Sequence, residues 1–175
     1  MSTILIQKTS ITDLSTDAIV NAANSGLRAG GGVCGAIFQE AGYCLLQDAC
    51  DSIGHCDTGS AVITPGFYMK SKYIIHAVGP IWQGGNQGEK ELLRKAYWNS
   101  LKLANQNMCH SIAFPLISSG IYGYPVKQAW EVALKACNDF IHEHPEIDLD
   151  IVFAVLNDTM VQMGNDVLKE IQVGI

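Results

Sequence analysis

The chain of 175 residues has the length of one ordinary domain, and a composition of 48% hydrophobic and 16% charged residues is typical of a compact globular protein. Its apolar runs are much shorter than the roughly 20 residues that span a bilayer, and no secretory signal pattern opens the chain, so we expect a soluble, cytoplasmic protein. The formal net charge of -6 and the lack of a lysine- or arginine-rich stripe argue against nucleic acid as a partner.

The first part of the chain predicts two short strands followed by two helices. The segments TILIQ (3–7) and DAIV (17–20) are apolar and β-branched, and the polar residues 9–16 connect them. Residues 32–42 and 43–54 carry helical patterns, and the second of these helices is expected to end at a glycine.

The middle of the chain predicts a pair of buried strands and a long helix. Residues 60–65 and 73–79 are apolar and β-branched, with a turn between them, and residues 88–106 repeat apolar side chains at helical spacing. The apolar side of this helix is expected to consist of Leu92, Leu93, Ala96, Tyr97, Ser100, Leu101 and Ala104.

The last part continues the alternation of strands and helices. Residues 111–117 and 148–156 predict strands, and residues 125–144 and 158–171 predict amphipathic helices. Because strands and helices alternate throughout, we expect one domain, residues 1–175, with a sheet covered by helices on both faces, an α/β/α sandwich.

Two glycine-rich segments follow predicted strands and precede predicted helices. The first, LRAGGGVCGAI, contains Gly30, Gly31 and Gly32, and the second, PLISSGIYGYP, contains two serines, two glycines and two tyrosines. Glycines lack the Cβ that keeps a ligand from the backbone, so their N–H groups can converge on an anion. Such segments can also be simple tight turns, and neither matches the P-loop or the dinucleotide-binding pattern. Their recurrence favours a phosphate site at one edge of the sheet.

The six cysteines are predicted to be reduced thiols, because they form no C-x-x-C pair and nothing indicates secretion. Cys44, Cys50, Cys56 and His55 are conceivable metal ligands, but their spacing matches no zinc pattern. We therefore predict no metal and no cofactor.

Three ordered blocks of the sequence resemble the signature blocks of the macrodomain family. These blocks are DAIVNAANSGLRAGGGVCGAI, HAVGPIW and FPLISSGIYGYP, and the resemblance extends over nearly the whole chain. It is closest to the bacterial O-acetyl-ADP-ribose deacetylase and MacroD-type branch. The resemblance implies a three-layer α/β/α sandwich with a mixed central sheet, which binds ADP-ribose in a cleft at the carboxyl edge of its strands.

The resemblance also implies roles for individual residues. Asn24 would touch the distal ribose, Asn21 would be mainly structural, and Ile19 and Val20 would underlie the adenine. His76 and Trp82 would support the fold, although a catalytic His76 is an alternative. The implied catalytic residues are Asn24 and Cys34. The implied ligand-binding residues are Ser10, Ile11, Ala22, Asn24, Gly31, Gly32, Val33, Cys34, Ser118, Ser119, Gly120, Ile121, Tyr122 and Leu156.

Three positions depart from the pattern of the family. Cys34 stands where the active branch has an aspartate that activates water, and a mostly protonated thiol is a poorer base. Ser10 replaces an aspartate that accepts from adenine, and Leu156 replaces an aromatic residue that stacks on it.

These departures leave more than one function open. The first hypothesis is a hydrolase, acting weakly on O-acetyl-ADP-ribose or on ADP-ribosylated side chains. The alternatives are a non-catalytic ADP-ribose reader and a binder of another phosphate-bearing, nucleotide-like ligand. The expected partners are therefore a small molecule, ADP-ribose or O-acetyl-ADP-ribose, or an ADP-ribosylated protein, and we expect a monomer.

Overall fold

The computed structural model describes residues 1–173, and its elements follow the predicted order closely. The strands are β1 (Thr3–Lys8), β2 (Ala18–Ala22), β3 (Ala61–Pro65), β4 (Tyr73–Ala77), β5 (Ser111–Phe114) and β6 (Asp150–Val155). The helices are α1 (Gly32–Ala41), α2 (Tyr43–Ile53), α3 (Glu89–Gln106), α4 (Val126–Glu143) and α5 (Asp158–Val173), with a short 3-10 helix, η1 (Ile11–Asp13).

The strands form one mixed sheet in the order β1-β6-β5-β2-β4-β3. Within residues 1–173, only the β3–β4 pair is antiparallel, and the other four pairings are parallel. Five strands therefore end at the same edge of the sheet, the place where open α/β sheets bind ligands.

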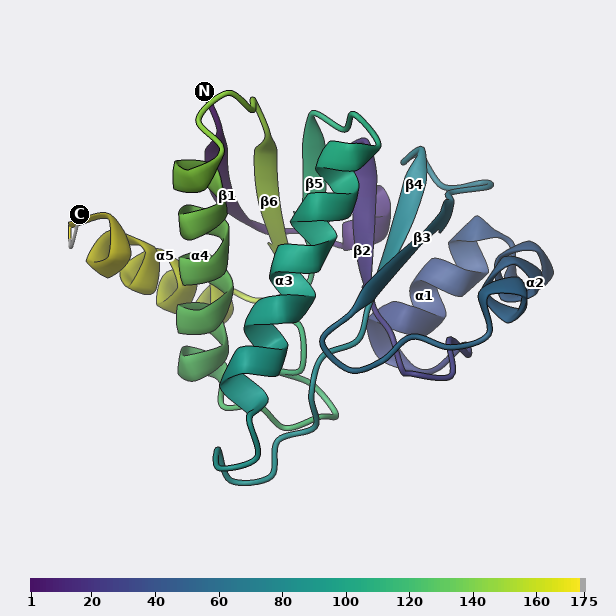
Figure 1. The fold of residues 1–175 in the computed structure, drawn as a ribbon, viewed down its shortest axis with the longest axis horizontal. Coiled ribbons are helices and arrows are strands. Elements are labelled where there is room, and N and C mark those ends of the chain that lie inside the picture. Colours follow the sequence, from purple (N-terminus) through teal and green to yellow (C-terminus); the bar gives the residue numbers. More distant parts are fainter. Residues whose placement is uncertain (174–175) are drawn as a thin grey trace.

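Helices cover both faces of this sheet, so the predicted three-layer sandwich is confirmed. In Figure 1, α3 and α4 lie in front of the strands, and α5 packs beside α4 on the same face. The helices α1 and α2 cover the opposite face. Side chains of β2 alternate accordingly, because Ala18 and Val20 belong to the core under α3 to α5 and Ile19 to the core under α1 and α2.

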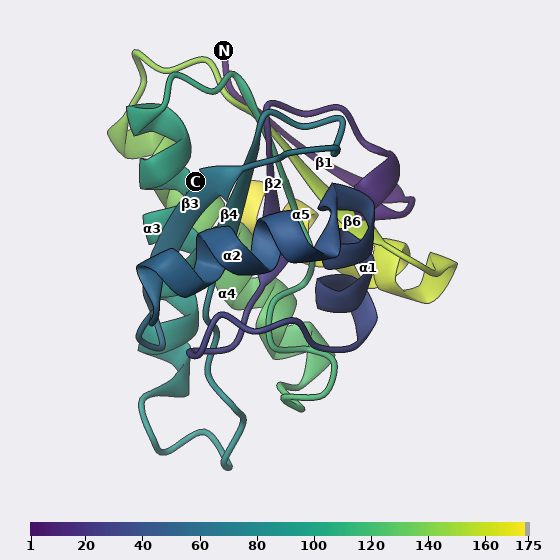
Figure 2. The ribbon, with the colours of Figure 1, turned by 90° about the vertical axis from the view of Figure 1, so that its right-hand side faces the viewer.

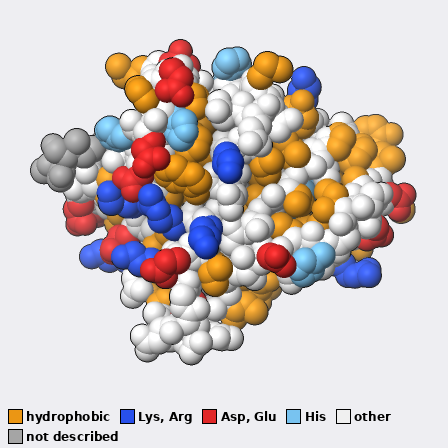
Figure 3. Space-filling model, viewed as in Figure 1, with side chains coloured by type: hydrophobic (Ala, Val, Ile, Leu, Met, Phe, Trp, Pro, Cys, Tyr) orange, Lys and Arg blue, Asp and Glu red, His pale blue; other side chains and the backbone are white. Residues whose placement is uncertain are grey.

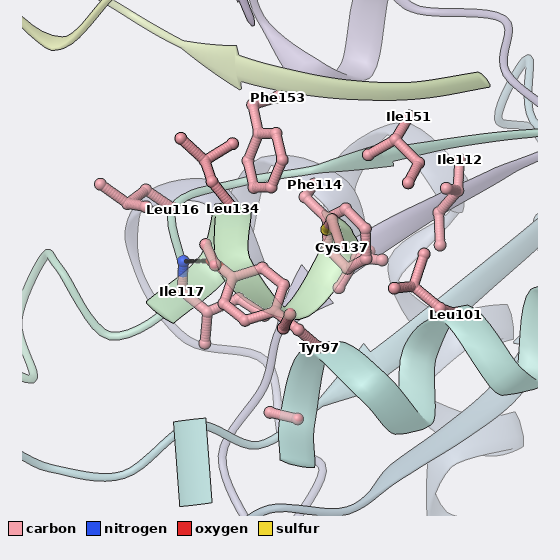
Figure 4. Packing of buried hydrophobic residues seen from close by; sticks show 14 of the residues in the cluster. Tyr97, Leu101, Ile112, Phe114, Leu116, Ile117, Leu134, Cys137, Ile151 and Phe153 are labelled. Atoms are coloured by element: carbon pink, nitrogen blue, oxygen red, sulfur yellow. Dashed lines mark hydrogen bonds between the residues drawn. The ribbon is translucent and has the colours of Figure 1, made fainter. Parts of the chain in front are cut away.

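The larger core anchors one wall of the ligand site. Figure 4 shows Tyr97 of α3 among Phe114, Phe153 and other apolar side chains, and its hydroxyl accepts a hydrogen bond from the N–H of Ile117 at 2.9 Å. Burial raises the pKa of this tyrosine, so the hydroxyl keeps its proton. The chain that leaves β5 is thus fixed to the core where the second glycine-rich segment begins.

Two predicted strands end earlier than expected. The strand predicted at 73–79 stops at Ala77, and that predicted at 111–117 stops at Phe114. Gly79, Pro80 and Pro115 follow, and a proline has no N–H for the ladder. Pro115, Leu116 and Ile117 beyond β5 line a cavity instead, and so does Gly79 beyond β4. The polar connection at 9–16 also contains η1, which was not predicted.

The surface over α3 and α4 carries acidic and basic side chains side by side, without a basic stripe (Figure 3). Among residues 1–173, no helix is long and apolar enough to cross a membrane.

Candidate ligand-binding site

A cavity of about 650 Å³ opens at the carboxyl edge of the parallel strands. Its walls come from the segments that follow β1, β2, β4, β5 and β6 and from the start of α1. Every ligand-binding residue predicted from the sequence lines this cavity. Within the described chain, no aspartate, glutamate, histidine, lysine or arginine lines it, so an anion there would have to be held by backbone N–H groups.

The first glycine-rich segment supplies one group of such donors. Helix α1 begins after Gly31, and no side chain caps its first turn. Within residues 1–173, the N–H groups of Gly32, Val33 and Cys34 therefore have no hydrogen-bond acceptor. A Cβ added to Gly31 or Gly32 would meet no atom within 4 Å, and Gly32 has φ +56°. This open helix N-terminus is suited to an anion.

The second glycine-rich segment supplies donors from the opposite side. In the part of the chain that the structure describes, the N–H groups of Gly120, Ile121 and Tyr122 donate to no acceptor. The two serine hydroxyls were expected to serve the ligand, but they donate within the protein. The hydroxyl of Ser118 donates to the carbonyl of Pro80 at 2.7 Å, and that of Ser119 to Leu116 at 2.7 Å. Both hydroxyls stabilise the turn, and the backbone is left to bind the ligand.

The segment after β4 supports this second loop from behind. A Cβ on Gly79 would lie 2.3 Å from the Oγ of Ser118, so only glycine allows the two segments to approach this closely. The N–H of Trp82 donates to the carbonyl of Tyr122 at 2.8 Å, and its ring packs on Tyr124 at a centroid distance of 4.7 Å. Trp82 therefore supports the fold at the cavity wall, as expected.

The loop that contains Trp82 is held by Glu89 at the start of α3. The carboxylate accepts hydrogen bonds from the N–H groups of Gln83 and Gly85, both at 2.9 Å, and of Gln87 at 2.6 Å. Burial of Glu89 opposes ionisation, but these backbone donors outweigh it and lower its pKa to about 2. The sequence offered no motif for this role.

The two predicted catalytic residues meet at the backbone of Arg28. The side-chain amide of Asn24 donates to the Arg28 carbonyl at 2.8 Å and accepts from its N–H at 3.0 Å. The thiol of Cys34, which is only 8% exposed, lies 3.9 Å from the same carbonyl. Asn24 keeps one N–H and one lone pair for a ligand, whereas Cys34 offers the cavity a largely buried sulfur.

The other end of the cavity is neutral and largely apolar. Ser10, which shares a hydrogen bond of 2.9 Å with Thr12, lies there with Ile11 and with Leu156, which is 69% exposed. The expectation that Ile19 and Val20 underlie the ligand is wrong, because both are fully buried in β2 and neither lines the cavity.

Several lining residues were missed by sequence reasoning. Asn157 and Met160 follow β6, and Asn157 caps α5 by accepting from the Met160 N–H at 2.9 Å. The pattern Asn-Asp at the start of a helix indicates a cap, which could have placed this residue at the strand end. The remaining lining residues that were not predicted are Thr9, Ala23, Gly30, Ala36, Gly79, Pro115, Leu116, Ile117, Ala154 and Val155.

Asn21 and His76 lie behind the cavity, in the core. The Nδ2 of Asn21 donates to the Nδ1 of His76 at 3.1 Å, so the Nε2 of the neutral ring carries the hydrogen that faces the Thr64 hydroxyl at 3.0 Å. Burial lowers the pKa of His76 to about 4. Because neither residue lines the cavity, the structural interpretation of both is confirmed, and the alternative of a catalytic His76 is wrong.

The metal alternative finds no support in the described residues. No group of three or more histidine, cysteine, aspartate or glutamate side chains is placed to hold an ion within residues 1–173. The six cysteines are free thiols, as predicted.

The chain has relatives in both sequence and structure. It is 57% identical over 135 residues to the O-acetyl-ADP-ribose deacetylase of Salmonella typhimurium, covering 75% of each chain. It is 50% identical over 151 residues to a macro domain-containing protein of Chlorobaculum tepidum, covering 86% of this chain and 87% of that protein.

Solved structures of macrodomains superpose closely on this chain. The Oceanobacillus iheyensis macrodomain with ADP gives a TM-score of 0.91 at 37% identity, covering 97% of this chain and 92% of that one. The Trypanosoma brucei macrodomain in complex with ADP gives 0.85 at 35% identity, covering 95% and 68%. The family model of the Macro domain matches residues 20–133. The chain therefore belongs to the Macro domain family.

Proposed function

We propose that this protein binds ADP-ribose in the cavity at the carboxyl edge of its sheet and hydrolyses O-acetyl-ADP-ribose. The observation that carries the proposal is that two sets of unpaired backbone N–H groups lie in opposite walls of a cavity that has no charged side chain among the described residues. Gly32 and Val33 line this space from one segment and Gly120 and Ile121 from the other, and their N–H groups are free to donate to a ligand. Such an arrangement suits a diphosphate, which carries its own charge.

Hydrolysis is supported by the relatives and by the place of Asn24. Relatives that are 56% and 57% identical carry the name O-acetyl-ADP-ribose deacetylase. Asn24 has one N–H and one lone pair left to orient a water or the ester. Since no carboxylate or histidine of the described chain lines the cavity, a phosphate oxygen of the ligand would take the proton of the attacking water. Turnover is therefore expected to be slow.

The test is to incubate the purified protein with O-acetyl-ADP-ribose and to quantify free ADP-ribose. Gly31→Val is the matched control, because its backbone is extended and the added side chain meets no protein atom within 4 Å of the Cβ. We expect release above the rate in buffer by the wild type and not by the control, with equal melting temperatures. Release at the rate in buffer would rule out the hydrolase.

A second candidate, a non-catalytic ADP-ribose reader, is favoured by Cys34. The thiol is largely buried, and it provides no carboxylate base at the wall of the cavity. Calorimetry that detects ADP-ribose binding at micromolar affinity, together with no release of ADP-ribose from the ester, would select this candidate.

A third candidate, a different phosphate-bearing ligand, is favoured by the uncharged end of the cavity near Ser10 and Leu156. Competition of nucleotides and nucleotide sugars against ADP-ribose separates it, because a compound that displaces ADP-ribose at lower concentration would be the better ligand. An ADP-ribosylated protein, a monomeric state and a cytoplasmic location remain predictions, and the free thiols support a reducing compartment.

A further inference from the structure

The segment between β2 and α1 contains a strained residue next to the glycines of the cavity. Leu27 has φ +55°, a left-handed conformation that is rare for a bulky side chain, and its side chain is buried at 2% exposure. Such a conformation is strained and persists only where surrounding contacts enforce it. The contacts around Leu27 therefore decide the course of the chain into Gly30–Gly32.

Two side-chain amides provide those contacts. Asn24 holds the backbone of Arg28 from within the loop, as described above. Gln47 of α2 holds the residues on either side of Arg28, because its Nε2 donates to the Leu27 carbonyl at 3.1 Å and its Oε1 accepts from the Ala29 N–H at 3.0 Å. The segment runs beside α2 in Figure 2. Three successive backbone units are thus fixed by two amides.

We propose that Gln47 is a positioning residue for the glycine-rich wall of the site. Gln47 does not line the cavity; it acts through Leu27 and Ala29 on the orientation of the N–H groups at the start of α1. This inference rests on the proposed binding of ADP-ribose and adds a residue that neither the family pattern nor the cavity lining identifies.

The role requires an amide, because the two contacts need opposite hydrogen-bonding groups. A carboxylate in place of the amide would still accept from Ala29, but it would face the Leu27 carbonyl and the Asp51 carboxylate without a hydrogen to donate. The nearby Asp51 carboxylate and partial burial would raise the pKa of that carboxyl above its ordinary value, so that protonation in mild acid would restore one donor. The variant Gln47→Glu should therefore be impaired at neutral pH and recover at acidic pH.

The experiment measures the Kd of ADP-ribose for the wild type and Gln47→Glu at pH 7.5 and pH 5. Gln162→Glu is the matched control, because the Nε2 of Gln162 donates to Asp166 at 2.9 Å, one turn later on the exposed side of α5, as that of Gln47 does to Asp51. Relative to the wild type at the same pH, we expect Gln47→Glu to bind at least tenfold more weakly at pH 7.5 and within about threefold at pH 5. The control should match the wild type at both values.

Binding by Gln47→Glu within twofold of the wild type at pH 7.5 would overturn the proposal, and so would an equal loss at both pH values. Amide hydrogen exchange of the unliganded protein at pH 7.5 tests the same role without a ligand. Peptides that cover residues 27–33 should exchange faster in Gln47→Glu but not in Gln162→Glu, and unchanged exchange would overturn the proposal. If the wild type binds no ADP-ribose, the proposed function fails, whereas hydrogen exchange still decides the role of Gln47.

Discussion

The side-chain amide of Asn24 forms hydrogen bonds with both the carbonyl and the N–H of Arg28, at 2.8 and 3.0 Å. This pair closes the turn that leads from β2 to the glycine-rich segment, and it holds the side chain of Asn24 in a fixed orientation at the wall of the cavity. The residue thus combines a structural contact with a position where it can touch a ligand.

Replacing Asn24 should weaken ligand binding for two reasons: the turn loses its contacts with Arg28, and the cavity wall loses a group that can touch the ligand. Asn24→Ala removes two hydrogen bonds, each with a net value of about 1 kcal/mol, and leaves the Arg28 carbonyl and N–H to water. We expect the affinity for ADP-ribose to fall about tenfold or more, as measured by calorimetry. Asn105→Ala, on the exposed side of α3, should bind like the wild type. Wild-type affinity in Asn24→Ala would contradict the assignment.

Introducing a carboxylate at Cys34 should raise hydrolysis. In Cys34→Asp, an ionised base would lie next to the start of α1, where the free N–H groups favour a negative charge. We expect the initial rate of ADP-ribose release from O-acetyl-ADP-ribose to rise at least tenfold. Cys44→Asp introduces the same charge at an exposed position of α2 and should leave the rate unchanged. A Cys34→Asp rate no higher than that of the wild type would show that the site lacks more than a base.

Enlarging Gly79 should displace the second cavity wall. The added methyl of Gly79→Ala would overlap the Ser118 hydroxyl and the side chain of Ile117, at 2.3 and 2.5 Å. Overpacking of this kind costs about 1–3 kcal/mol, so urea unfolding should show a lower free energy of unfolding. In Gly120→Ala the methyl meets no atom within 4 Å, and stability should not change. Equal free energies of unfolding for the two variants would refute the close approach of Gly79 to Ser118.

Stability should fall with acidity because of His76. In the unfolded chain an imidazole gains a proton below its ordinary pKa of 6.5, whereas burial keeps His76 neutral in the folded protein down to a pKa of about 4. Protons therefore favour the unfolded chain between these values. We expect a loss of about 2 kcal/mol between pH 8 and pH 5. The ionised Glu89 also contributes to stability, because its pKa is lowered to about 2 in the folded protein. That contribution is lost only as the pH falls below 4.5, the ordinary pKa of a glutamate.

Urea unfolding at pH 8 and pH 5 checks this dependence. His76→Gln keeps a group that forms hydrogen bonds but cannot titrate in this range, so its free energy of unfolding should change little between the two pH values. His110→Gln removes an exposed histidine and should retain the wild-type dependence. If His76→Gln loses stability at pH 5 as strongly as the wild type, another group is responsible.

The elements and the place of the site followed from local patterns of the sequence. The apolar periods predicted each strand and helix, and six of the seven residues expected on the apolar side of α3 are buried, with Leu92 only partly so. Gly31 and Gly32 predicted a backbone segment that no side chain shields from a ligand. What local patterns could not predict are contacts between distant segments: Gly79 against Ser118, and Gln47 against Leu27, depend on how two segments meet in the fold.

The errors have the same origin. Ile19 and Val20 predicted a strand correctly, but their burial follows from the central position of β2, with helices on both faces of the sheet. From the sequence, the hydroxyls of Ser118 and Ser119 could have been expected to bind a ligand. In the structure they donate to carbonyl groups that come near only when the turn is folded. The roles proposed for the cavity residues, and the single-domain assignment for residues 1–175, stay predictions.

The uncharged lining of the cavity among the described residues bears on how such proteins diverge. Peptide N–H groups are present whatever side chains surround them. Anion binding by such groups would therefore not be abolished by a single substitution of a charged residue. Side chains such as those of Cys34 and Leu156 can then vary. Such changes would alter the turnover or the selectivity for adenine, while the binding of the anion by the backbone is kept. Under the proposed function, backbone N–H groups would serve recognition and side chains would serve the chemistry, so natural selection could adjust one without sacrificing the other.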